Sequence, residues 1–138
     1  MKIVYWSGTG NTERMAELIK EGIGQAGKSI EVVNVSDANV DELLKDEMLI
    51  LGCPAMGDEV LEESEFEPFI EEISSKISGK KVALFGSYGW GDGQWMRDFE
   101  ERMIEYGCTI ISSPLIIQYA PDDNEEECIN FGKEIASA

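Results

Sequence analysis

The chain has 138 residues, and its 28 acidic against 11 basic side chains give a formal net charge of −17. Such a surface repels nucleic-acid phosphates and anionic lipid headgroups, which argues against nucleic acids and membranes as partners. It would be steered towards positively charged protein surfaces, unless the charge serves only solubility. The length suits a single domain, residues 1–138, with a sizeable core.

The content of cysteine and histidine excludes several kinds of site. Cys53, Cys108 and Cys128 lie far apart, and there is no histidine. This pattern argues against a disulfide framework, a zinc site and an iron–sulfur cluster, so we expect no metal site. We also find no apolar run long enough to cross a bilayer and no signal peptide, and we therefore expect a cytoplasmic protein.

Strand and helix patterns alternate along the whole chain. The patterns predict strands over residues 1–6, 30–35, 48–53, 82–87 and 109–118, and helices over 11–26, 39–44, 94–106, 125–136 and a segment with Pro68 in its first turn. The fifth strand is interrupted at Ser112-Ser113-Pro114. This alternation predicts an α/β fold with a doubly wound parallel sheet, whose ligands bind beyond the carboxyl ends of the strands.

The first strand is followed by a loop of glycines and small polar residues. The loop reads Ser7-Gly8-Thr9-Gly10-Asn11-Thr12 and leads into a helix. Its side-chain donors, its accessible backbone N–H groups and the positive end of the helix dipole suit a single phosphate. Neither a Walker A lysine nor the third glycine of a dinucleotide-binding loop is present. The plainer alternative is an ordinary turn in which Asn11 or Thr12 caps the helix.

Two further loops end at the same edge of the predicted sheet. After the third strand comes Pro54-Ala55-Met56-Gly57-Asp58-Glu59, with a flexible thioether beside a glycine. After the fourth strand comes Gly86-Ser87-Tyr88-Gly89-Trp90-Gly91-Asp92-Gly93, in which glycines bracket two large aromatic side chains. Together with the phosphate loop, these features indicate a site for a phosphorylated, flat aromatic molecule.

At these three loops the sequence resembles the flavodoxin family, and specifically its short-chain type from anaerobic bacteria. The resemblance covers the whole chain and implies a five-stranded sheet of order 2-1-3-4-5 that binds flavin mononucleotide (FMN) non-covalently. Residues 7–12 would hold the phosphate, Met56 and Trp90 would sandwich the ring, and the backbone near Gly89 and Glu59 would bond its polar edge. The implied cofactor-binding residues are Ser7, Gly8, Thr9, Gly10, Asn11, Thr12, Pro54, Ala55, Met56, Gly57, Asp58, Glu59, Ser87, Tyr88, Gly89, Trp90 and Gly91.

The resemblance implies a monomeric electron carrier that can substitute for ferredoxin and docks transiently on iron–sulfur or flavin oxidoreductases. It would cycle between a neutral semiquinone, stabilised by a peptide flip at Gly57, and an anionic hydroquinone. Five carboxylates in or beside the ring-binding loops, with no lysine or arginine within those loops, would disfavour the second negative charge and give a low potential. These are Asp58, Glu59, Glu62, Glu63 and Asp92.

Three other classes of protein fit the sequence less well. A signalling receiver domain needs acidic residues where Ser7-Gly8 and Cys53-Pro54 stand. A flavin-dependent quinone or nitro reductase is the alternative function, but no residue is placed as an acid or base towards a substrate. A purely structural interaction domain would not need the three loops.

Overall fold

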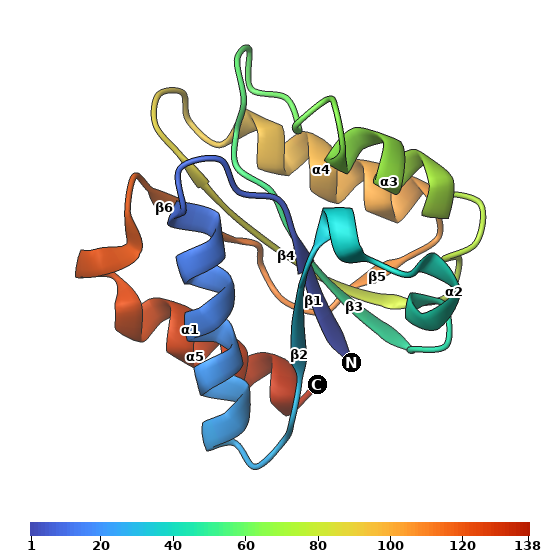
Figure 1. The fold of residues 1–138 in the computed structure, drawn as a ribbon, viewed down its shortest axis with the longest axis horizontal. Coiled ribbons are helices and arrows are strands. Elements are labelled where there is room, and N and C mark those ends of the chain that lie inside the picture. The colour runs from blue at the N-terminus through green and yellow to red at the C-terminus, as the bar shows by residue number, and fades with distance from the viewer.

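Alternating strands and helices occupy the whole chain, and the computed structural model describes all residues, 1–138 (Figure 1). The strands are β1 (Lys2–Tyr5), β2 (Glu31–Asn34), β3 (Met48–Gly52), β4 (Lys81–Tyr88), β5 (Thr109–Ile110) and β6 (Leu115–Gln118). The α-helices are α1 (Asn11–Gln25), α2 (Val40–Leu43), α3 (Phe66–Ile73), α4 (Gln94–Glu105) and α5 (Glu125–Ala136). Short 3-10 helices are formed by Val35–Asp37 and Pro121–Asp123. None of the helices combines the length and the apolar composition that spanning a bilayer requires.

All strands join one parallel sheet in the order β2-β1-β3-β4-β5, and β6 also pairs with β4. The predicted α/β fold and strand order are therefore confirmed. The predicted interruption of the fifth strand is also confirmed, because β5 and β6 follow the same side of β4 with residues 111–114 between them. Pro114 lies in this gap and lacks the N–H that a ladder hydrogen bond needs.

Helices cover both faces of the sheet, and each face has its own core. In β1, Ile3 packs in the cluster under α1 and α5, whereas Val4 packs in the cluster under α3 and α4 (Figure 1). Ile50 and Leu51 of β3 alternate in the same way. Because both faces are covered, nearly all residues of the central strands β1, β3 and β4 are buried, which explains the continuous apolar runs of the sequence.

The helix boundaries agree with the sequence patterns except in the shortest helix. Of the predicted helix over 39–44, only the turn Val40–Leu43 forms, and the Asn39 side chain caps it by accepting a hydrogen bond from Glu42 N–H at 3.1 Å. Helix α3 has Pro68 in its first turn as predicted and ends at Ile73. Ile77 lies beyond this helix and is still fully buried in the core.

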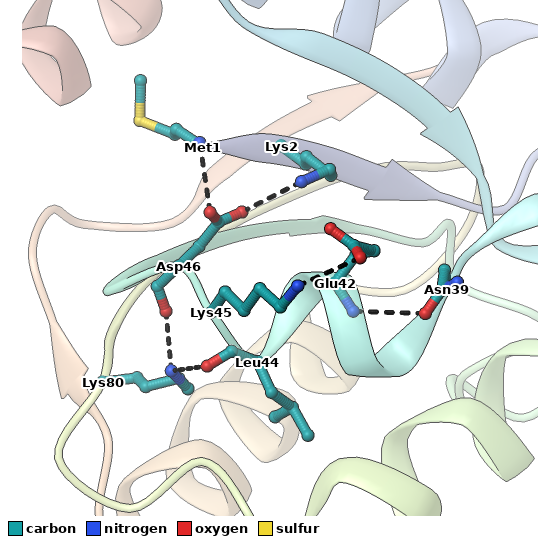
Figure 2. A network of polar contacts seen from close by, with 8 residues as sticks. All are labelled: Met1, Lys2, Asn39, Glu42, Leu44, Lys45, Asp46 and Lys80. Carbon is teal, nitrogen blue, oxygen red and sulfur yellow. Dashed lines mark hydrogen bonds and ion pairs between the residues drawn. The ribbon is translucent and has the colours of Figure 1, made fainter.

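The amino ends of the strands are joined by a network around Asp46 (Figure 2). One carboxylate oxygen of Asp46 lies 3.5 Å from the Met1 amino group, and the other lies 3.5 Å from Lys2 Nζ. Lys80 Nζ donates to the backbone carbonyls of Leu44 at 2.8 Å and Asp46 at 2.6 Å. Charge-assisted contacts therefore stabilise the amino ends of the strands. The opposite, carboxyl edge of the sheet is the edge at which a ligand can bind.

Candidate functional site

A cleft of about 270 Å³ lies at the carboxyl edge of the sheet and is lined by the three loops that the sequence singles out. Of the predicted residues, it is lined by Ser7, Gly8, Thr9, Asn11, Thr12, Pro54, Ala55, Met56, Ser87, Tyr88 and Gly89. The remaining predicted residues, Gly10, Gly57, Asp58, Glu59, Trp90 and Gly91, are not among those that line it. The loops following β1, β3 and β4 thus converge on one hollow, although they are far apart in the sequence.

One end of the cleft is the uncapped start of α1. The N-cap residue is Gly10, whose φ of 97° is left-handed, and no side chain caps the helix. The alternative that Asn11 or Thr12 is the N-cap is therefore wrong. None of the backbone N–H groups of residues 11–13 donates to a protein acceptor, so the positive end of the helix dipole is available to an anion.

The phosphate loop is held in shape by its own hydroxyl groups. Ser7 Oγ accepts a hydrogen bond from Gly10 N–H at 3.1 Å, which closes the turn. Thr12 Oγ1 lies 3.0 Å from Ser87 Oγ, and this buried pair joins α1 to the end of β4. The free N–H groups and the absence of any Lys or Arg lining the cleft fit a phosphate bound through backbone and hydroxyl donors.

The loop after β3 is a tight hairpin whose tip stands away from the cleft. Met56 and Val60 exchange two backbone hydrogen bonds, at 2.9 and 3.0 Å. Between them Gly57 has a φ of 46°, and no backbone N–H donates to its carbonyl group. Glu59 has a φ of 58°, and its Oε1 accepts from Gln94 N–H at 3.1 Å. The two ends of the hairpin are therefore held by backbone hydrogen bonds, whereas the Gly57 carbonyl has no hydrogen-bond partner.

The end of β4 places Tyr88 in the cleft, and the loop that follows places Trp90 on the surface. Tyr88 lies against the buried Trp95 of α4, with ring centroids 5.4 Å apart. Trp95 Nε1 donates to the Cys53 carbonyl at 3.0 Å and so anchors the start of the neighbouring loop. Trp90 is 65% exposed and does not line the cleft, so its place against a bound ring stays a prediction.

Cys53 lies directly beneath the cleft and is fully buried. Burial raises the pKa of its thiol to about 12, and its Sγ accepts a hydrogen bond from Glu62 N–H at 3.4 Å. A thiol with this pKa is not a nucleophile at neutral pH. Cys53 is therefore a core residue that directly follows β3.

Two of the five expected carboxylates have their charge compensated by the fold. Glu62 is only 5% exposed, and its carboxylate accepts hydrogen bonds from the backbone N–H groups of Ser64 at 2.7 Å, Glu65 at 2.6 Å and Phe66 at 3.2 Å. It therefore caps the start of α3.

Asp92 is compensated by an ion pair with α4. Its Oδ1 lies 2.9 Å from Arg97 Nη2, and the Arg97 Nη1 donates to the Asp92 carbonyl at 3.1 Å. The loops themselves contain no basic residue, but Arg97 of α4 contacts the loop after β4. Of the other three carboxylates, Glu59 accepts a single hydrogen bond from Gln94 N–H at the start of α4, whereas Asp58 and Glu63 have no partner.

Two residues that line the cleft were not identified from the sequence. Trp6 ends the first strand pattern and immediately precedes the phosphate loop. Tyr119 follows β6 and brings a fourth loop to the site. The rule that ligands bind beyond the carboxyl ends of the strands points to the position of Tyr119, but no motif marks the residue itself.

The chain is similar to known proteins in sequence and in fold. The family model described as Flavodoxin matches residues 3–132. Flavodoxin from Clostridium beijerinckii is 73% identical over 137 residues, which cover 99% of each chain. Flavodoxin from Megasphaera elsdenii is 46% identical over 138 residues, which cover 100% of this chain and 99% of the relative.

Solved structures give the same result. The solution structure of two-electron reduced Megasphaera elsdenii flavodoxin matches with a TM-score of 0.90 and covers 99% of this chain and 98% of its own. A flavodoxin from the domain Archaea matches with a TM-score of 0.87 at 34% identity, covering 99% and 97%. The chain therefore belongs to the flavodoxin family, which consists of small FMN-binding proteins that transfer electrons.

Proposed function

We propose that the chain is a low-potential one-electron carrier that holds FMN in the cleft between the loops after β1, β3, β4 and β6. The observation that carries this proposal is the uncapped start of α1 in a cleft that the apolar and aromatic side chains of Met56, Tyr88 and Tyr119 also line. When bound, FMN supplies the electron chemistry, and the protein supplies binding, orientation and electrostatics.

The phosphate end is assigned to residues 7–12. The free N–H groups of residues 11–13, together with the hydroxyl groups of Thr9 and Thr12, would donate to the phosphate without any basic side chain. Met56 and Tyr88 also line the cleft and would exclude water from the ring. In this proposal Gly57, Glu59, Trp90 and their neighbours reach the ring from the rim of the cleft.

The acidic rim has two consequences for the carrier. Asp58, Glu59 and Glu63 would disfavour additional negative charge in the cleft, which lowers the potential at which a second electron is accepted. The same charges would steer the carrier towards basic surfaces on iron–sulfur or flavin oxidoreductases. Added salt should therefore slow reduction of the carrier by such a partner.

We further propose that the carrier works as a monomer in the cytoplasm. All three cysteines are free and buried, as suits a reducing compartment. Sedimentation of the purified protein would test the oligomeric state, and a stable dimer would contradict it.

Stepwise anaerobic reduction of the purified protein, followed by its visible spectrum, tests the function. We expect a yellow protein that takes up two electrons in separate steps, with the second step at low potential. A single two-electron step, together with steady turnover of reduced nicotinamides, would instead indicate a flavin-dependent reductase. A protein that holds no flavin after FMN is added would contradict the assignment of the cleft.

A further inference from the structure

Tyr119 is an exposed aromatic side chain beside the cleft, at a position that no sequence motif marks. It follows β6 directly and lines the cleft together with Met56 and Tyr88. Its exposed fraction is 63%, and Trp90 is the one other aromatic side chain that is similarly exposed. Because Trp90 follows β4 and Tyr119 follows the parallel neighbour β6, both stand at the carboxyl edge of the sheet, where the site is.

The backbone of Tyr119 is held in an unfavourable conformation. Its φ is 62°, a left-handed value that glycine and asparagine adopt readily and a tyrosine rarely does. Its N–H donates to the Tyr88 carbonyl at 2.7 Å, and Gln118 Nε2 donates to the Gly89 carbonyl at 3.0 Å. These two bonds fix the residue against the loop after β4, so the conformation is imposed by the fold.

The ring of Tyr119 lies over the backbone of that loop. A Cβ atom placed on Gly89 would lie 3.5 Å from Tyr119 Cε1, which is ordinary contact distance. Glycine at position 119 would remove the strain but would also remove the ring from the cleft. A strained residue in a ligand-binding loop points to a function for its side chain.

We propose that the ring of Tyr119 is a fourth contact for the flavin end of bound FMN, and that its left-handed backbone places the ring there at the expense of stability. The inference rests on the proposed function, because it needs FMN in the cleft. Tyr119 is assigned to the flavin end because its neighbours Tyr88, Gly89 and Met56 belong to the ring-binding loops. The ring adds apolar contact area to the ligand and shields the cleft mouth from water.

Two substitutions in the full-length chain, each stripped of FMN and titrated with it, test this contact. Tyr119→Gly removes both the ring and the strain, so we expect FMN to bind about tenfold more weakly while the urea midpoint of the FMN-free protein does not fall. Tyr119→Phe keeps the ring, so its affinity should stay within about twofold of the parent. Ile104→Ala, which trims an exposed side chain on α4, is the control and should change neither quantity.

The outcomes separate this inference from the proposed function. Unchanged FMN affinity in Tyr119→Gly would overturn the contact, and so would a parallel fall in urea midpoint and affinity, since a structural role would then suffice. Equal losses in Tyr119→Phe and Tyr119→Gly would also overturn it, by assigning the effect to the hydroxyl group. Failure of the parent chain to bind FMN would contradict the proposed function itself.

Discussion

The buried hydroxyl pair between the phosphate loop and β4 allows a quantitative test of how the site is built. Thr12 Oγ1 and Ser87 Oγ are 3.0 Å apart, and the two residues are 1% and 5% exposed. Thr12→Val keeps the shape of the side chain but leaves the Ser87 hydroxyl without this partner. An unpaired buried polar group costs about 1–3 kcal/mol. We therefore expect Thr12→Val to lower the free energy of unfolding of the FMN-free protein by about 1–2 kcal/mol, and Ser87→Ala to act similarly.

The double substitution shows whether the two hydroxyl groups act as a pair. When both are removed, no unpaired hydroxyl is left, so the loss should be smaller than the sum of the single losses by about 1 kcal/mol. Urea unfolding of the four FMN-free proteins, followed by circular dichroism, measures this coupling. Ser74→Ala removes an exposed hydroxyl and should change the stability by less than about 0.5 kcal/mol. Additive losses would refute the pairing.

The same proteins test the role of these hydroxyl groups in the cleft. Thr12 and Ser87 both line it, and Thr12 lies in the first turn of α1. Loss of one hydroxyl donor worth about 1.4 kcal/mol would weaken FMN binding about tenfold in Thr12→Val. Unchanged FMN affinity, measured by fluorescence titration, would show that this hydroxyl serves the fold and not the ligand.

Three further predictions follow from single residues. Gly57 has a φ of 46°, and a Cβ added there would have nothing within 4 Å. Gly57→Ala should therefore destabilise the FMN-free protein by about 1 kcal/mol through backbone strain alone. A urea midpoint equal to that of the parent would contradict this. Arg97→Gln removes the cation beside Asp92 and should lower the potential for the second electron by about 20 mV, equivalent to roughly 0.5 kcal/mol; a rise in a spectroelectrochemical titration would contradict the electrostatic reasoning. Burial, and then the hydrogen bond to Glu13 at 2.7 Å, raise the pKa of Tyr5 from 10.0 to about 12, so this residue stabilises the fold below pH 10 and loses its effect as the pH rises to 12. Tyr5→Phe should therefore have a lower urea midpoint than the parent at pH 8, and the difference should narrow at pH 11; a constant difference would show that titration of Tyr5 is not involved.

Much of the fold is predictable from the sequence because both faces of the sheet are covered. Covered strands produce apolar runs such as Met48–Gly52, and the helices between them carry one apolar side, so α1, α4 and α5 are predicted within one residue at each end. The prediction fails where local patterns are weak. Of the predicted segment 39–44 only one turn is helical, because Asn39 is its N-cap and Leu44 its C-cap.

The site is predictable where it consists of loops and not where it depends on contacts between distant side chains. Residues 7–9, 11–12, 54–56 and 87–89 line the cleft because the topology alone brings the carboxyl ends of β1, β3 and β4 together. The return of Arg97 to Asp92 depends on the direction of a long side chain. The turn of Tyr119 towards Gly89 depends on one φ angle. Neither leaves a periodic signal in the sequence.

The features that would serve the proposed ligand lie at the carboxyl edge of the sheet, and most of them oppose stability. Stability is lowered by N–H groups of α1 that have no cap and by left-handed backbone at Glu59 and Tyr119. Carboxylates without a partner lower it further. The opposite edge, around Asp46 and Lys80, has its charges and carbonyl groups paired (Figure 2). The two cores and the paired amino edge can therefore offset the unfavourable features of the carboxyl edge. Binding of FMN to that edge should raise the free energy of unfolding of the protein.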